Sequence, residues 1–231
     1  MIDRLYPFAR STYRWLLGLW SRTPNLVGDR DIENTFVIQH MPSGPGKALD
    51  FGANTSSMSL MAARKGFSVV ALDLLPLDFP WVHPNIQTLQ GDILKVEFEE
   101  ASFDLEINLS TVEHVGLAGR YGVKAMESDG DLLAMRRLHR WMKDQSRMLL
   151  TIPVGQDAVF IPMNRVYGEK RLPKLIEGYR VLHEEFWAKP AKDNKWRQVS
   201  KEEALSFPAR AGSRSPFMNI YALGCFVLQK A

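Results

Sequence analysis

The densest group of chemically active side chains in this sequence follows a short apolar run that ends at Leu109. Hydroxyls, a carboxylate, an imidazole, a guanidinium and a phenol lie together in a glycine-punctuated segment, at Ser110, Thr111, Glu113, His114, Arg120 and Tyr121. Such a set can remove a proton from a bound molecule and hold its polar groups. A purely structural role would be costly, because every buried polar group would need a partner.

His114 is the candidate general base of this segment, because the ordinary pKa of histidine is about 6.5. Glu113 is expected to orient His114 or to bind an amino group of a cofactor. Arg120 is expected to hold a polar group of the substrate, and Tyr121 to line the pocket. The alternative for His114 is a structural imidazole, since a lone histidine more often serves packing than catalysis.

Two later side chains, Arg165 and Tyr167, are predicted to reach the same edge of the fold as substrate contacts. The alternative for Arg165, and equally for Arg120, is an ion pair with Asp129 or Asp131 that fixes the loop. Either arginine can serve both purposes.

Acidic residues also stand where successive apolar runs end. Asp73 can accept hydrogen bonds from ribose hydroxyls, and Asp92 can accept one from an adenine amino group. Asp50 lies inside an earlier run, so its alternative role is to cap or orient the loop that begins at Gly52. The candidate cofactor contacts are Asp50, Gly52, Ala53, Asn54, Asp73, Leu74, Asp92, Ile93 and Ser110.

The loop after the first apolar run argues against a nicotinamide or flavin cofactor. A dinucleotide fingerprint places three glycines at this turn, whereas Gly52 stands alone and Thr55 and Ser56 follow it. A single glycine with small polar neighbours still permits a tight turn and close approach of a ligand. The loop therefore suits a cofactor that has no pyrophosphate.

The elements that position these residues alternate in the manner of an α/β fold. Strands are predicted at 47–52, 68–73, 86–92, 103–109, 147–153, 179–187 and 221–229. Helices are predicted at 58–65 with Gly66 as C-cap, at 131–143 with Asp129 or Asp131 as N-cap, at 169–177 with a kink or break at Pro173, and after Ser200.

Residues 1–45 are interpreted as an N-terminal helical extension and residues 46–231 as the cofactor-binding domain. Apolar side chains between Leu5 and Leu19 recur at helical spacing, with Arg10 and Arg14 on the other side. Such a helix can pack on its own domain, cover the site as a lid, dock a partner, or lie at a membrane interface.

The composition narrows the class of protein. Hydrophobic residues make up 45% and charged residues 24% of the chain, which is ordinary for a folded soluble protein. The formal charge of +3 does not indicate nucleic-acid binding, and no apolar run is long enough for a membrane span. One cysteine, Cys225, precludes an intrachain disulfide and fits a reducing, cytoplasmic location.

No spacing of histidine, cysteine and carboxylate residues indicates a zinc site, so no metal ligand is predicted. His40, His83, His139 and His183 are scattered and are interpreted as structural or exposed. A magnesium ion held by aspartate and substrate oxygens stays open.

The order of these features resembles the class I methyltransferases that use S-adenosylmethionine. The resemblance rests on the acid and glycine-led turn from Asp50 to Asn54, on Asp73 and on Asp92, and it covers residues from about 47 to 230. It implies a three-layer Rossmann-like α/β sheet of about seven strands, closed by an antiparallel C-terminal hairpin, with S-adenosylmethionine as cofactor. The chain departs from the pattern in the later glycines of the turn.

A narrower resemblance joins several segments of the second half of the chain. The segments 113–117, 119–122, 129–131, 153–155 and 165–168 are similar to an uncharacterised methyltransferase-like family of unknown function. The chain departs from that family by an extra residue within 117–120 and by the sequence of 123–127. The resemblance implies a shared fold and site, and it names no substrate.

The leading hypothesis is a methyltransferase acting on a small polar acceptor, first of all an oxygen of a sugar or another small metabolite. Arginine, tyrosine, asparagine and tryptophan side chains suit such polyhydroxylated ligands. The alternatives are a non-catalytic member of the fold that binds a nucleoside or a protein, and a nicotinamide-dependent oxidoreductase. The oligomeric state is left open.

Overall fold

The computed structural model of the protein describes residues 26–190, 195–209 and 222–231. The helix predicted between Leu5 and Leu19 lies outside these described residues. Within them, no helix has both the length and the apolar character needed to cross a bilayer.

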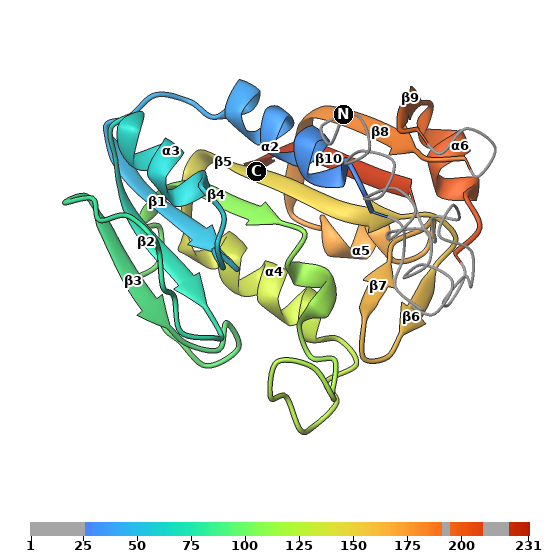
Figure 1. Ribbon diagram of the computed structural model, residues 1–231, viewed down its shortest axis with the longest axis horizontal. Helices are drawn as coiled ribbons and strands as arrows, with labels where there is room; N and C mark the ends of the chain where they lie inside the picture. The colour runs from blue at the N-terminus through green and yellow to red at the C-terminus, as the bar shows by residue number, and fades with distance from the viewer. Residues whose placement is uncertain (1–25, 191–194, 210–221) are drawn as a thin grey trace, which may run out of the picture.

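The centre of the fold is an eight-stranded sheet with the strand order β3-β2-β1-β4-β5-β10-β8-β9 (Figure 1). Its strands are β1 (Gly46–Phe51), β2 (Phe67–Asp73), β3 (Ile86–Gln90), β4 (Phe103–Leu109), β5 (Met142–Val154), β8 (Tyr179–Ala188), β9 (Arg197–Val199) and β10 (Ala222–Lys230). Strands β1 to β5 run parallel, and β10 is antiparallel to both β5 and β8. The Rossmann-like sheet with antiparallel C-terminal strands is therefore confirmed, and β9 adds a short strand at its edge.

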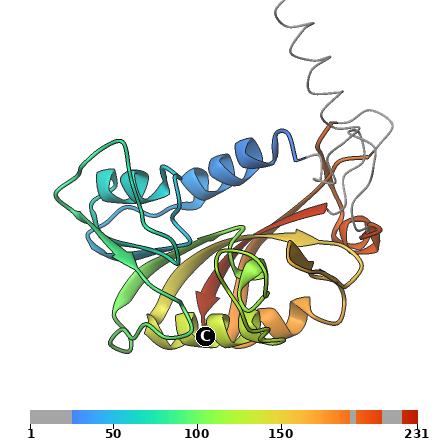
Figure 2. The same cartoon turned by 60° about the horizontal axis from the view of Figure 1, so that its bottom comes forward.

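Helices cover both faces of the sheet, as Figure 2 shows from the side. On one face lie α2 (Asp29–His40) and α3 (Met58–Arg64), and on the other lie α4 (Gly130–Trp141), α5 (Leu172–Leu175) and α6 (Lys201–Ser206). Phe36 and Val37 of α2 are buried in the same hydrophobic cluster as Met58 of α3. The segment expected as an N-terminal extension therefore contributes its last helix to the core.

The local signals in the sequence locate most of these elements. Gly66 follows α3 with φ +100°, the left-handed conformation of a helix C-terminus. The side chain of Ser200 accepts the Glu203 N–H at 3.1 Å and caps α6 as predicted. Asp129 is the N-cap residue of α4, but its side chain makes no capping bond.

Three expectations about elements are wrong or incomplete. Pro173 does not break a helix: it lies in the first turn of α5, where its missing N–H is not needed. The apolar segment around Val159 forms a hairpin of β6 (Ala158–Phe160) and β7 (Asn164–Val166), which its sequence does not predict. The helical extension predicted at residues 1–45 contains α2, but its largely polar sequence does not predict a separate helix that packs on the core and buries one acid, Glu33.

The strand order places a switch point between β1 and β4, since β1 pairs with β2 on one side and with β4 on the other. Ligands of open α/β sheets bind at such a point, beyond the carboxyl ends of the strands. Gly52 has φ +74° there, and a Cβ atom on it would lie 2.2 Å from side-chain atoms of Thr111. The loops that follow β1 and β4 therefore touch at Gly52, and only glycine fits there.

Glu106 is a buried acid in the middle of the sheet. It lies in β4 opposite Leu49 and Met148 and is 0% exposed. Neither carboxylate oxygen has a hydrogen-bond partner among the described residues. Burial raises the pKa of Glu106 well above its ordinary value, and the charge of Lys230 opposes this only in part.

We expect Glu106→Gln to remove a pH-dependent loss of stability. A raised pKa means that the folded protein keeps a proton which the unfolded chain releases above about pH 4.5, so the stability contributed by Glu106 falls as pH rises through its folded pKa. A tenfold difference between the folded and unfolded acid dissociation constants corresponds to about 1.4 kcal/mol. Urea unfolding between roughly pH 5 and pH 9 should show a steeper decline for the natural protein than for the variant.

The matched control is Glu99→Gln, an exposed acid whose loss should leave the pH dependence unchanged. Other buried acids with raised pKa values remain in all three proteins, so the difference between curves isolates Glu106. Parallel curves for the natural protein and Glu106→Gln would contradict the expectation.

Candidate active site

Asp73 ends β2 and Asp92 follows the end of the neighbouring β3, both at the carboxyl edge of the sheet. Asp73 is opposite Gln90 in the β2–β3 register, and the Gly91 N–H donates to the carbonyl of Asp73 at 2.8 Å. The two carboxylate oxygens of Asp73 accept the N–H groups of Asn54 (3.0 Å) and Leu75 (2.9 Å). Both oxygens keep a further lone pair that can accept a hydroxyl of a ligand.

Asp92 has a comparable local role. Its Oδ1 atom accepts the Leu94 N–H at 3.0 Å, and its Oδ2 atom lies 3.5 Å from the Lys95 ammonium. The side chain is about one-third exposed, so it remains open to a ligand at this edge. Ile93 beside it is buried and is part of the hydrophobic core.

The loop after β1 is shaped for close approach. Gly52 and Asn54 both have left-handed backbones, with φ +74° and +42°. Asparagine tolerates this conformation better than most residues, so Asn54 serves where a second glycine would otherwise be expected. Ala53 is fully buried, and no large side chain from these three positions fills the edge of the sheet.

Asp50 is a buried carboxyl beneath the loop at Gly52. It is 2% exposed, and the Ser59 hydroxyl donates to its Oδ2 atom at 2.6 Å. Burial raises its pKa to about 6, and the Ser59 hydrogen bond opposes the shift. These contacts fit the alternative role that the sequence allowed for Asp50. The side chain links β1 to α3 and so orients the loop that begins at Gly52.

A second acidic group, absent from the predicted site, comes from α2. Glu33 is 1% exposed, and its Oε1 atom accepts the hydroxyls of Thr151 (2.9 Å) and Ser110. Its Oε2 atom pairs with the Arg30 guanidinium at 2.8 Å. Desolvation raises the pKa of Glu33, and the charge of Arg30 opposes this. Glu33 thus ties α2 to the ends of β4 and β5.

Glu113 and His114 lie in η1 (Val112–His114), directly after β4. Glu113 is 2% exposed, its Oε2 atom has no partner among the described residues, and burial raises its pKa to about 8. His114 Nε2 lies 3.7 Å from Glu113 Oε1, which is too long for a hydrogen bond. At neutral pH the carboxyl of Glu113 is therefore largely protonated.

The imidazole of His114 is held in one orientation. Its Nδ1 atom lies 2.6 Å from the carbonyl of Met163, which can only accept, so Nδ1 carries the proton and Nε2 has the free lone pair. Burial lowers the pKa of His114 to about 4, and the charge of Arg120 acts in the same direction. The ordinary pKa of histidine, assumed from the sequence, is therefore wrong for His114, because burial disfavours the charged imidazolium.

The exposed loop after η1 brings Arg120 and Tyr121 to the same place. Arg120 donates to the Met163 carbonyl at 3.0 Å and lies over the Tyr121 ring, 4.5 Å from its centre. The Tyr121 ring meets the His114 ring edge to face at 5.9 Å, and Tyr121 is 41% exposed. Three of the four residues predicted as catalytic thus meet around one carbonyl of the turn between β6 and β7.

The predicted substrate contacts Arg165 and Tyr167 are instead interior residues. Both are 0% exposed, so neither borders an open pocket. Arg165 donates to the carbonyls of Glu113, Val115, Glu127 and Ser128 and pairs with Asp131 at 3.4 Å. The alternative role, an ion pair that fixes the loop, is therefore the one that Arg165 fills. A buried arginine with five donors suits a set of converging carbonyls.

Arg171, which no pattern in the sequence indicates, completes this arrangement. It binds Asp131 with two nitrogens, at 2.9 and 2.5 Å, and pairs with Asp129 at 3.1 Å. The fully buried carboxylate of Asp131 therefore faces two guanidinium groups.

We expect Asp131→Asn to destabilise the protein by about 3–5 kcal/mol, because it leaves a buried guanidinium without its counter-charge. The matched control is Asp129→Asn, which removes a 60% exposed partner of the same Arg171 and should cost no more than about 1 kcal/mol. Urea unfolding at neutral pH measures both values. Equal, small effects would show that the buried pair does not hold the loop.

The fold is that of S-adenosylmethionine-dependent methyltransferases. The Burkholderia thailandensis 1,6-didemethyltoxoflavin-N1-methyltransferase, crystallised with S-adenosylhomocysteine, aligns over 100% of this chain and 85% of its own at 12% identity and TM-score 0.55. Haemonchus contortus phosphoethanolamine N-methyltransferase 2, also with S-adenosylhomocysteine, aligns over 87% and 52% at 14% identity and TM-score 0.56.

The same fold also occurs in a protein named for a different reaction. The [4+2]-cyclase SpnF aligns over 87% of this chain and 80% of its own at 12% identity and TM-score 0.55. No curated protein matches the sequence. A family described as "Caenorhabditis protein of unknown function, DUF268" matches residues 85–204.

Proposed function

The chain belongs to the DUF268 family, and from this premise we propose that it is an S-adenosylmethionine-dependent methyltransferase. Its acceptor is a small polar molecule, in first place an oxygen of a sugar or another small metabolite. One observation carries the proposal: Asp73 ends β2 and Asp92 follows the end of β3 at the carboxyl edge of the sheet, beside the switch point where the loops after β1 and β4 touch. Glu113 and His114 follow β4 at the same edge.

The residues at this edge fit the cofactor. Asp73 keeps lone pairs for the ribose hydroxyls, and Asp92 keeps exposed oxygens for the adenine side. The turn of Gly52, Ala53 and Asn54 leaves its backbone accessible at the sheet edge, which suits a ligand without a pyrophosphate. Of the remaining predicted contacts, Leu74 and Ile93 follow Asp73 and Asp92 in the chain, and Ser110 follows β4.

We expect S-adenosylhomocysteine to bind saturably and Asp73→Asn to weaken that binding by about tenfold to a hundredfold, because one charged acceptor is lost. Isothermal titration of the full chain measures this, with NADH as a ligand that should not bind. Asp78→Asn, which removes an exposed acid nearby, is the control and should bind normally.

Each result that contradicts this expectation favours a different interpretation. Binding of NADH in place of S-adenosylhomocysteine would favour an oxidoreductase. Binding of neither would favour a non-catalytic member of the fold. If Asp73→Asn bound S-adenosylhomocysteine as tightly as the natural protein, Asp73 would not be the residue that contacts the ribose.

S-Adenosylmethionine supplies an electrophilic methyl group, so the chain must hold the acceptor in line and remove one proton. Arg120 and Tyr121, which lie in the exposed loop, are placed to hold a polyhydroxylated acceptor. His114 presents Nε2 as the proton acceptor, since Met163 holds Nδ1. The carboxylate form of Glu113, 3.7 Å away, stabilises the imidazolium that results.

If His114 accepts the proton and the carboxylate of Glu113 stabilises the imidazolium, turnover should rise with pH. Burial places the pKa of Glu113 at about 8, so its carboxylate, and with it the basicity of His114, increases as pH passes through that value. Methyl transfer to a panel of sugars and sugar phosphates, followed with labelled S-adenosylmethionine, should show this rise. Glu113→Gln should abolish it, because the amide cannot ionise.

His114→Asn separates proton transfer from positioning. The asparagine amide can still donate to the Met163 carbonyl, but the Nε2 lone pair is lost, so turnover should fall by about 10²–10⁴. S-Adenosylhomocysteine affinity should stay unchanged, which excludes misfolding as the cause. Turnover that survives the substitution would make proximity, and not base catalysis, the mechanism.

A further inference from the structure

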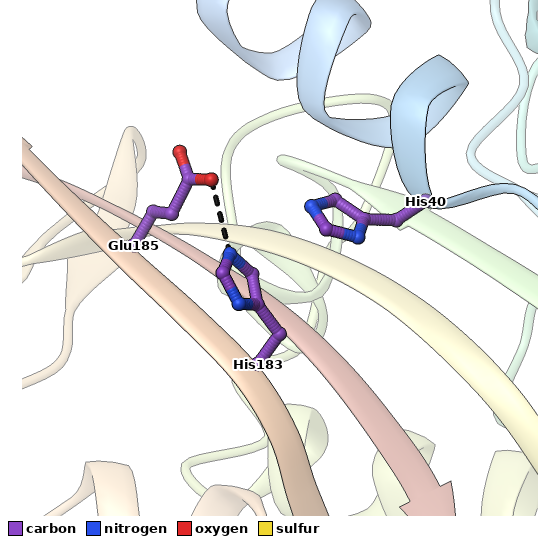
Figure 3. Close-up of side chains that lie close together, drawn as sticks. All are labelled: His40, His183 and Glu185. Atoms are coloured by element: carbon purple, nitrogen blue, oxygen red, sulfur yellow. Dashed lines mark hydrogen bonds and ion pairs between the residues drawn. The ribbon is translucent and has the colours of Figure 1, made fainter.

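A second cluster of ligand-type side chains lies apart from the carboxyl edge, between α2 and β8. Figure 3 shows His40 at the end of α2 facing His183 and Glu185 on β8. One ligand atom from each of the three residues lies within 4.8 Å of the others. The Nε2 atom of His183 is 3.0 Å from Oε1 of Glu185, and the two imidazole rings are 4.6 Å apart.

The fold brings these residues together from distant parts of the chain. His183 and Glu185 are two positions apart on a strand, so their side chains point to the same face of the sheet. Helix α2 packs over that face, and the ring of Phe36 lies 4.6 Å from His40 and 6.1 Å from His183. The positions 40, 183 and 185 have no spacing that a zinc motif would show, which is why the sequence predicted no metal site.

The hydrogen bond between His183 and Glu185 explains the position of two of the three side chains, but ring packing against Phe36 leaves a nitrogen of His40 to be explained. The Nε2 atom of His40 is buried and has no hydrogen-bond partner among the described residues. A buried polar atom without a partner is costly, and a native protein rarely keeps one without a purpose. The unpaired nitrogen belongs to the cluster that also presents a second imidazole and a carboxylate.

We propose that His40, His183 and Glu185 bind a divalent transition-metal ion, zinc before others. Two imidazoles and one glutamate form a recognised zinc ligand set, and the borderline character of Zn²⁺ suits nitrogen with oxygen. Ligand bonds of about 2.0–2.2 Å require the three atoms to approach to about 3.3 Å from one another. His183 and Glu185 are already that close, and the ligand atom of His40 lies within 4.8 Å of theirs.

The surroundings of the cluster support this assignment. The indole N–H of Trp187 donates to Oε2 of Glu185 at 3.3 Å, which orients the carboxylate and leaves Oε1 toward His183. The side chain of His183 is 45% exposed, so an ion can arrive from solvent and keep a water as fourth ligand. The charge of Arg147 acts against a cation here, and the carboxylate of Glu185 offsets it.

A metal at this position would clip α2 to β8. The same helix carries Glu33 to the ends of β4 and β5, so the ion would also secure one wall of the proposed active site. Its role is structural, because no side chain of the cluster is among the residues at the carboxyl edge. The proposal stands independently of methyl transfer.

The test uses the tag-free full chain after treatment with EDTA, titrated with Zn²⁺ by calorimetry and followed by thermal unfolding. We expect one ion per chain and a Tm that rises with Zn²⁺ concentration. His183→Ala and Glu185→Gln should each weaken binding by about a hundredfold or more and remove the rise in Tm. His83→Ala, which removes a histidine outside the cluster, should bind as the natural protein does.

Two outcomes would overturn the proposal. One is the absence of saturable binding by Zn²⁺ and by Co²⁺. The other is binding that persists in His183→Ala and Glu185→Gln while circular dichroism shows both variants folded. Bound Co²⁺ adds a spectroscopic check, since its visible bands should indicate nitrogen and oxygen ligands and a sulfur charge-transfer band would instead implicate Cys225. S-Adenosylhomocysteine titration with EDTA present keeps this result separate from the proposed function.

Discussion

The placement of the candidate active site depends on one buried carboxylate, that of Asp131. It pairs with both Arg165 and Arg171, and Arg165 in turn donates to the carbonyls of residues on both sides of the loop that follows η1. Leu117 and Val115 anchor the start of this loop in the core, whereas the residues from Lys124 to Asp129 are exposed, so the carbonyl contacts of Arg165 hold that part of the loop. The fully buried guanidinium of Arg165 is tolerated because it meets the equally buried carboxylate of Asp131, whereas Arg171 keeps 23% of its side chain exposed. Because Arg165 also donates to the carbonyls of Glu113 and Val115, its pairing with Asp131 helps to fix the position of Glu113 and His114.

Desolvation also sets the chemistry of that position. Glu33, Glu113 and Asp50 are all buried acids, and burial raises the pKa of each. The imidazole of His114 responds to the same environment in the opposite direction, since its charged form is the one that burial disfavours. Burial thus leaves an acid with a pKa of about 8 beside an imidazole whose pKa is lowered to about 4.

Helix α2 joins these features to the rest of the molecule. At one end it delivers Glu33 to Ser110 and Thr151, and at the other it delivers His40 to His183. Both contacts rest on the apolar side of the helix, where Phe36 and Val37 enter the core. The methyltransferase fold of the known structures serves reactions as different as N-methylation and cyclisation, so the use of this scaffold in the DUF268 family depends on such local groups.

The sequence by itself determined the fold class and the edge where the site lies. Alternating apolar runs, small-residue turns and strand-end acids are local signals, and they located β1 to β5, α3, α4 and the acids Asp73 and Asp92. Tertiary structure alone decided which polar residues stay exposed at the carboxyl edge and which are buried in the core. Arg165 and His114 carry no local mark of their burial, and Glu33, Arg171 and the His40 cluster become neighbours only when distant segments pack. Local patterns report the preferences of the backbone, whereas desolvation and pairing of charge depend on what the rest of the chain brings alongside.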